Sequence, residues 1–117
     1  FNGGPLSVPA HMTDPDALAF CYMPTLWPDL PDFTSAWSAY YTAMEDLAAR
    51  IMTAFAAALD LPDDFFDPLI ADPVSALRAL HYPATTDAFL ERQQRAGAHS
   101  DFGSLTILLP QRGSTGL

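Results

Sequence analysis

Two residues near the C-terminal end of the chain, His99 and Asp101, carry side chains that could hold a metal ion together. In an extended segment, residues i and i+2 point to the same side, about 7 Å apart at their Cα atoms. A neutral imidazole and a hard carboxylate oxygen suit a borderline divalent ion, and a further histidine would complete a two-histidine, one-carboxylate ligand face. No third ligand is evident in the sequence. The alternative for an isolated His-x-Asp is a surface imidazole beside a turn carboxylate.

The other candidate polar residues have weaker claims to such a site. His81 would be a ligand only if it faced the same cavity as Tyr82, and adjacent strand residues point to opposite faces. A structural role is therefore favoured for His81. His11 lies in a proline-rich segment and is given no role. The run Arg112-Gly113-Ser114 is interpreted as a turn between strands.

Charge and composition exclude several classes of partner. The net charge is −9, with five arginines and no lysine, so neither nucleic acid nor an anionic membrane surface is an expected partner. The most apolar stretch, Ile51–Leu59, is far shorter than the roughly 18 residues of a membrane span. The chain shows no signal-peptide pattern, and the single Cys21 allows no internal disulfide. We therefore expect a reducing, cytoplasmic environment.

Hydrophobic spacing predicts one long amphipathic helix over residues 34–59, capped by Asp32 or Thr34. Its apolar side is expected to pack on a sheet through the residues Trp37, Met44, Leu47, Ile51 and Phe55. Residues 1–31 are proline-rich, which predicts short extended pieces between turns and no long helix. A single helical turn is expected over 62–66.

Strands are predicted over residues 75–82, 96–99 and 105–109. Pro83 favours an extended conformation for the residue before it, and alternation places Leu105, Ile107 and Leu109 on one face. One long helix followed by strands indicates the α+β class, with a sheet that residues 75–117 begin but do not complete.

Several segments, in this order, resemble one family. They are Trp27-Pro28-Asp29-Leu30-Pro31, the helix with Tyr40-Tyr41, Leu61-Pro62-Asp63-Asp64-Phe65-Phe66, Leu77-Arg78-Ala79-Leu80-His81-Tyr82-Pro83, and Gly97-Ala98-His99-Ser100-Asp101-Phe102-Gly103-Ser104-Leu105-Thr106. Together they are similar to the isopenicillin N synthase-like group of Fe(II)/2-oxoglutarate-dependent dioxygenases. The similarity covers most of residues 27–109.

The resemblance implies a fold, a cofactor and site residues. It implies a partial double-stranded β-helix (a jelly roll) with a long flanking helix, Fe(II) as the metal and 2-oxoglutarate as cosubstrate. His99 and Asp101 match the first two iron ligands. Tyr82 matches a tyrosine that reaches the carboxylate of 2-oxoglutarate or of substrate, and Arg78, on the same strand face, is a looser match for the same role. No residue is assigned as a catalytic acid or base.

The family's distal histidine and its Arg-x-Ser pair are expected beyond Leu117. We therefore expect residues 1–117 to form an incomplete oxygenase domain that is inactive by itself, acting as a whole protein on a small molecule with O₂. The oligomeric state is left open. Two alternatives remain: an oxidase of the isopenicillin N synthase type that needs no 2-oxoglutarate, and a non-catalytic acidic module that binds a partner through its proline- and aromatic-rich N-terminal segment.

Overall fold

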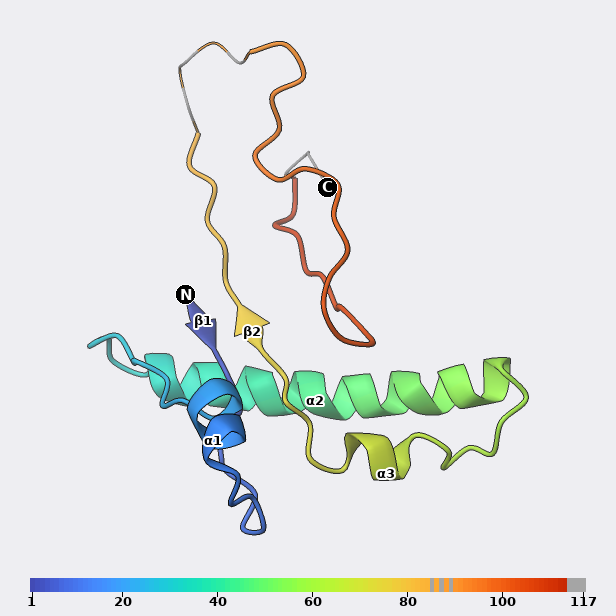
Figure 1. The fold of residues 1–117 in the computed structure, drawn as a ribbon. Helices are drawn as coiled ribbons and strands as arrows, with labels where there is room; N and C mark the ends of the chain where they lie inside the picture. The colour runs from blue at the N-terminus through green and yellow to red at the C-terminus, as the bar shows by residue number, and fades with distance from the viewer. Residues whose placement is uncertain (85, 87, 89, 114–117) are drawn as a thin grey trace. The chain divides into compact units, whose positions relative to one another are not determined.

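The computed structural model describes residues 1–84, 86, 88 and 90–113 (Figure 1). The chain divides into two compact units, residues 1–81 and 82–117. The first holds all the helices and strands of the described residues, in the order β1, α1, α2, α3, β2.

The long helix α2 (Phe33–Ala58) lies one residue from the predicted bounds of 34–59 and has 26 residues. Alanine and unbranched side chains dominate it, and these are strong helix formers. It ends in a Schellman motif, in which the Leu61 N–H donates to the Ala56 carbonyl at 2.9 Å. Asp60 takes the left-handed conformation that this motif needs, with φ of 55°.

The start of α2 differs from the prediction. Asp32 precedes the helix, but its φ is 59° and its side chain makes no capping hydrogen bond. The Ser35 hydroxyl donates instead to the Asp32 main-chain carbonyl at 2.9 Å. A left-handed residue turns its side chain away from the first helical N–H groups, so neither Asp32 nor Thr34 acts as the expected side-chain cap.

The buried face of α2 is also rotated from the one expected. Its buried residues are Tyr41, Met52 and Ala56, whereas Phe55 is 40% exposed. The Tyr41 hydroxyl donates to the Ser75 carbonyl at 2.9 Å, which ties this face to the segment just before β2. The other four residues of the expected face, Trp37, Met44, Leu47 and Ile51, are half-buried, so spacing predicted the apolar stripe but not its buried centre.

The sheet of the first unit consists of two short antiparallel strands. β1 (Asn2–Gly3) pairs with β2 (Leu77–Arg78), with Asn2 opposite Arg78 and Gly3 opposite Leu77. The strand predicted over 75–82 is therefore present only at its centre. A strand needs a hydrogen-bonded neighbour, and β1 supplies one for these two residues.

Four aromatic rings pack where β1 meets the start of α2. The Phe1 and Trp37 ring centroids lie 4.7 Å apart in an edge-to-face arrangement, and Phe33 and Trp37 stack at 5.7 Å. Trp27 lies 5.9 Å from Phe1. Gly3 is needed here, because a Cβ atom at this position would come within 2.9 Å of Trp37 Nε1.

The helix α1 (Pro15–Cys21) was not predicted within the proline-rich segment. The Asp14 carboxylate caps it by accepting the Asp16 N–H at 2.8 Å and the Ala17 N–H at 3.0 Å. An aspartate followed by proline at the first helical position is a start signal that the general frequency of prolines concealed.

The connection after α2 contains more helix than the single turn expected over 62–66. Residues 63–66 form turns, and the short helix α3 (Asp67–Ile70) follows them directly. Asp67 and a proline occupy its first turn, where both residue types are favoured.

The second unit has no helix or strand among its described residues. The strands predicted over 96–99 and 105–109 are therefore absent from the structure, although Leu105–Leu109 lacks turns or bends. Extended backbone becomes a strand only beside a partner, and the described part of this unit provides none. The jelly roll remains a prediction.

Candidate metal-ligand pair

His99 and Asp101 lie side by side in the second unit. His99 Nε2 is 3.1 Å from Asp101 Oδ1. Two donor atoms that bind one ion at about 2.1 Å and at right angles lie about 3 Å apart. The distance therefore fits two neighbouring corners of an octahedral metal site. The two side chains are 67% and 49% exposed, so this pair is open to solvent.

The second ring nitrogen of His99 is held by the backbone. Nδ1 lies 2.9 Å from the Gly97 carbonyl oxygen, which can only accept, so Nδ1 carries the proton. This leaves Nε2 as the nitrogen that binds a metal when the ring is neutral. Metal-binding histidines usually have such a support at the ring nitrogen that does not bind.

The same contacts raise the pKa of His99 above its ordinary value of 6.5. The hydrogen bond to the Gly97 carbonyl contributes most, and the negative charge of Asp101 adds to it. Both stabilise the imidazolium form, because a carbonyl and a carboxylate each favour a positive ring.

The second oxygen of Asp101 is held as well. The Thr106 hydroxyl donates to Oδ2 at 2.7 Å. The chain bends over residues 102–104 to allow this, and Gly103 has φ of 95°, a conformation that glycine adopts without a Cβ clash. Asp101 therefore directs one oxygen to Thr106 and the other to His99.

Sequence reasoning did not identify Gly97 and Thr106 as supports of this pair. Both lie within the segment that carries the resemblance, two residues before the histidine and five residues after the aspartate. Within the described residues there is no group of three or more His, Cys, Asp or Glu side chains that could hold a metal ion.

The two predicted carboxylate-binding residues lie in different units. Arg78 is in β2, opposite Asn2. Tyr82 begins the second unit and is 52% exposed. Within the second unit, the structure brings His99 and Asp101 together.

The remaining candidates also have defined surroundings. His11 Nε2 lies 3.5 Å from Asp72 Oδ2 in the first unit, an ion pair that the sequence did not predict. His81 is exposed at the end of that unit. Arg112 and Gly113 lie in a turn, but among the described residues no strand precedes it, and Ser114 lies outside the described residues.

Comparison with known proteins relates this chain to a class of enzymes. The chain is 39% identical over 87 residues to a 2-oxoglutarate-Fe(II) type oxidoreductase, hxnY, of Emericella nidulans; the match covers 74% of this chain and 25% of that protein. The chain belongs to the Fe(II)/2-oxoglutarate-dependent dioxygenase family. No family model matches it, and no solved structure matches it.

Two further members of the family extend the comparison. Clavatol oxidase of Penicillium crustosum is 38% identical over 102 residues, covering 77% of this chain and 29% of that protein. Validamycin A dioxygenase of Streptomyces hygroscopicus is 34% identical over 113 residues, covering 93% of this chain and 31% of that protein. The chain therefore spans between a quarter and a third of the length of these relatives.

Proposed function

We propose that this chain is part of an oxygenase that uses Fe(II) and 2-oxoglutarate to oxidise a small organic molecule with O₂. In this proposal His99 and Asp101 are two of the three protein ligands to iron. The observation that carries it is the 3.1 Å approach of His99 Nε2 to Asp101 Oδ1, with the other atom of each side chain held by Gly97 and Thr106.

The chain's own residues would hold and orient the metal. Iron supplies the redox chemistry with O₂ when it is bound, while the protein fixes the ligands and positions the substrate. The Gly97 carbonyl keeps the proton on Nδ1 and so presents Nε2. The Thr106 hydroxyl fixes the rotation of the Asp101 carboxylate and presents Oδ1. Because these two hydrogen bonds already orient the side chains, each side chain loses less conformational freedom when it binds a metal.

Tyr82 and Arg78 are proposed to contact the carboxylate of 2-oxoglutarate or of substrate. A guanidinium binds a carboxylate through two parallel hydrogen bonds, and a phenol donates one. The alternation of side chains along an extended segment supports this pairing of Arg78 with Tyr82, four residues apart.

The substrate is proposed only as a class. The relatives' names include a clavatol oxidase and a validamycin A dioxygenase, which differ in the molecule they act on. A small organic substrate is what these names share. Among the described residues, no helix combines the length and apolar character that a membrane span requires. A cytoplasmic location, as expected for a chain with one cysteine, belongs to the same proposal.

Turnover of 2-oxoglutarate tests the proposal. A protein of the relatives' length that carries residues 1–117 is expected to form succinate from 2-oxoglutarate with Fe(II) and O₂. His99→Ala and Asp101→Ala should each abolish this, whereas Glu91→Gln, an exposed charge change in the same unit, should not. Oxygen consumption without succinate would favour the oxidase alternative. Full activity in His99→Ala would refute the ligand assignment.

A further inference from the structure

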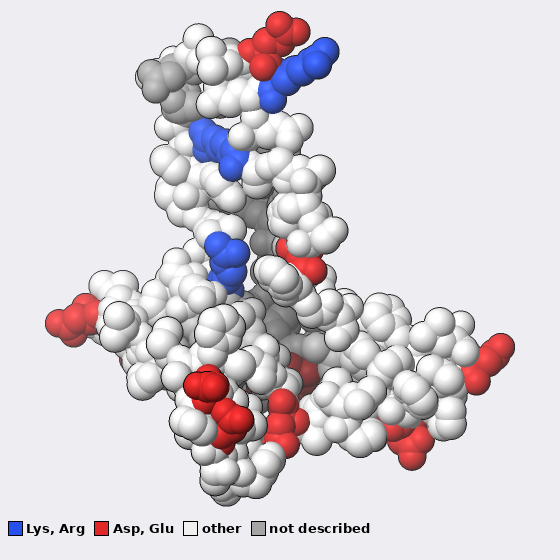
Figure 2. Space-filling view, viewed as in Figure 1, with Lys and Arg blue, Asp and Glu red and all other residues white. Residues whose placement is uncertain are grey.

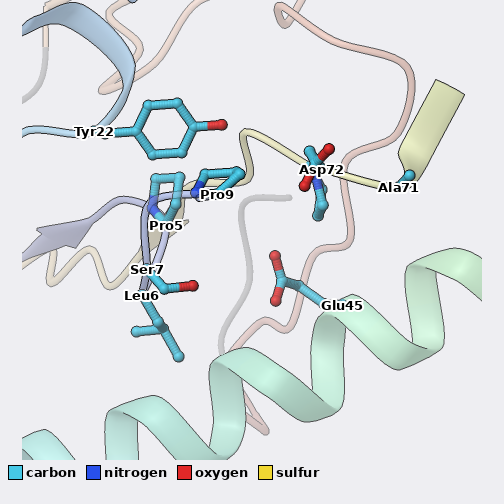
Figure 3. A pocket seen from close by; sticks show the side chains of 9 residues that line it. Pro5, Leu6, Ser7, Pro9, Tyr22, Glu45, Ala71 and Asp72 are labelled. Atoms are coloured by element: carbon cyan, nitrogen blue, oxygen red, sulfur yellow. The ribbon is translucent and has the colours of Figure 1, made fainter. Parts of the chain in front are cut away.

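The first unit contains a pocket built independently of His99 and Asp101. It has a volume of about 200 Å³ and lies between the N-terminal segment, α2 and the chain after α3. Its walls are apolar over Pro5, Leu6, Pro9, Ala71 and Pro73, and its polar groups come from Ser7, Tyr22, Glu45 and Asp72. Figure 3 shows the hydroxyls and carboxylates of these four residues facing a common space.

Tyr22 directs a phenol hydroxyl into this pocket (Figure 3). The residue is only 9% exposed, and its hydroxyl points into the pocket (Figure 3). Within the described part of the chain, that hydroxyl makes no side-chain hydrogen bond. The residue is buried, but its hydroxyl is reached from the pocket, so a ligand there can form a hydrogen bond with it.

The carboxylates determine the charge of that ligand. Glu45 approaches from α2, and Asp72 approaches from the segment after α3 (Figure 3). His11 Nε2 lies 3.5 Å from Asp72 Oδ2, and His11 is not among the residues that line the pocket. Two carboxylates in one small pocket repel each other and favour a cation between them.

The net negative charge of the whole first unit also favours a cation. Residues 1–81 contain eleven acidic residues and two arginines, whereas residues 82–117 contain three of each. The entire net charge of −9 therefore arises in the unit that forms the pocket. Figure 2 shows acidic side chains at several places on the face of this unit in view. A field of one sign raises the local concentration of ligands of the opposite sign.

The lining distinguishes an organic cation from a metal ion. Among the described residues no group of three potential metal ligands occurs, and proline, leucine and alanine carbons form the walls. An ammonium group has three N–H donors, which match the Glu45 carboxylate, the Asp72 carboxylate and the Tyr22 hydroxyl. Its carbon chain would contact the apolar walls.

We propose that this pocket binds a primary ammonium group, with Glu45 and Asp72 pairing its charge and Tyr22 accepting one hydrogen bond. The volume is below the roughly 300–1,000 Å³ of sites for drug-sized ligands, so the occupant is a small amine or one lysine side chain. A free amine and a lysine side chain both present a primary ammonium group on a carbon chain. The site does not depend on the proposed oxygenase function.

Amide NMR titration of the chain with n-butylammonium tests the site. We expect shifts at residues lining the pocket and a dissociation constant of about 1 mM. The controls are n-butanol, which lacks the charge, and trimethyl-n-butylammonium, which lacks the N–H donors. Both should bind at least about tenfold more weakly, because charge-assisted hydrogen bonds are the stronger ones. Equal shifts with n-butanol would overturn the proposal.

Substitutions of the lining residues test whether n-butylammonium binds in this pocket. Glu45→Gln and Asp72→Asn should each weaken n-butylammonium binding about tenfold, and Tyr22→Phe about threefold. Asp46→Asn makes the same charge change at an exposed neighbour of Glu45 and should change affinity less than about twofold. Circular dichroism establishes that each variant retains its helix. Equal weakening by Asp46→Asn and Glu45→Gln, in folded proteins, would contradict a specific pocket.

A second ligand distinguishes the two sources. Nα-acetyl-lysine methylamide presents the same ammonium on a peptide backbone. Tighter binding of this compound than of n-butylammonium supports a lysine side chain of a protein, and equal or weaker binding supports a free amine. If neither compound shifts the pocket residues, the proposal is wrong.

Discussion

The Thr106 hydroxyl donates a 2.7 Å hydrogen bond to Oδ2 of Asp101, the carboxylate oxygen that does not face His99. Five residues separate the two partners, and the bend at Gly103 brings them together. The bond leaves Oδ1 as the oxygen directed at the imidazole. The turn at Gly103 thus determines which Asp101 oxygen is available to bind a metal ion.

Thr106→Val should weaken metal binding by about tenfold, because supports of this kind typically contribute 10- to 100-fold in affinity. The substitution removes the hydroxyl with little change in shape and lets the Asp101 carboxylate rotate. Anaerobic titration with Fe(II), or with Co(II) followed by its absorption, measures the effect. Thr106→Ser keeps the donor and should bind as the natural chain does. Unchanged affinity in Thr106→Val would contradict the role of this bond.

The His99 imidazole should titrate above its ordinary value of 6.5 in the metal-free chain. Its ion pair with Asp101 is complete below that pH and is lost as the pH rises through the raised pKa. Asp101→Asn removes the negative charge and should lower the pKa of His99, although the Gly97 carbonyl still raises it. Imidazole NMR signals, followed with pH, measure this.

Glu91→Gln is the matched control for that titration, because it removes one exposed carboxylate from the same unit. It should leave the His99 titration unchanged. A midpoint for His99 at or below 6.5 in the natural chain would show that these two contacts do not form in solution.

The Tyr41 phenol should remain protonated until unusually high pH. Its burial, followed by the charge of Glu45, raises its pKa to about 12 from an ordinary value of 10.0. A raised pKa means that the folded state holds this proton more tightly. Its contribution to stability is therefore complete below pH 10 and is lost as the pH rises to about 12.

Alkaline titration by tyrosine absorption, with Tyr41→Phe as reference, measures this group. The variant loses the hydrogen bond to the Ser75 carbonyl and should be less stable at neutral pH by about 1 kcal/mol. Its stability should then fall less steeply than that of the natural chain above pH 10. If the titration step that disappears in Tyr41→Phe has its midpoint near pH 10, Tyr41 is not buried in solution.

Local signals predicted local structure. The bounds of α2 were predicted to within one residue, since helix propensity and spacing act along the chain. The closeness of His99 and Asp101 likewise follows from their separation by one residue. The Asp14 cap of α1 is also a local signal, but the frequent prolines around it obscure this helix start.

Features that need a distant partner were harder to predict. The extent of β2 depends on β1, some 75 residues away, and the buried side of α2 depends on the segment around Ser75. Pocket residues Tyr22, Glu45 and Asp72 come from three separate segments with no common motif. Spacing along the chain carries no information about such contacts.

Ala56 should tolerate a larger side chain poorly. It is 0% exposed on the buried face of α2, so Ala56→Leu inserts methylene groups where no space exists. Overpacking of this kind costs about 1–3 kcal/mol. Ala57→Leu, at the exposed neighbouring position, makes the same chemical change and should be nearly neutral. Thermal unfolding followed by circular dichroism compares them, and equal melting temperatures would show that this face is not packed.

Gly3→Ala should disturb the packing of β1 on α2. The added Cβ atom would lie 2.9 Å from Trp37 Nε1, closer than van der Waals contact allows, and the indole is held between Phe1 and Phe33. Relief requires a shift of the ring or of the strand, at a cost of about 1–3 kcal/mol.

Gly4→Ala is the control, because its Cβ would approach no closer than 3.8 Å, to the Cys21 carbonyl. Tryptophan fluorescence and thermal unfolding together report the change. We expect Gly3→Ala to lower the melting temperature and alter the emission, while Gly4→Ala leaves the emission unchanged; the same emission from both variants would mean that β1 does not pack against Trp37.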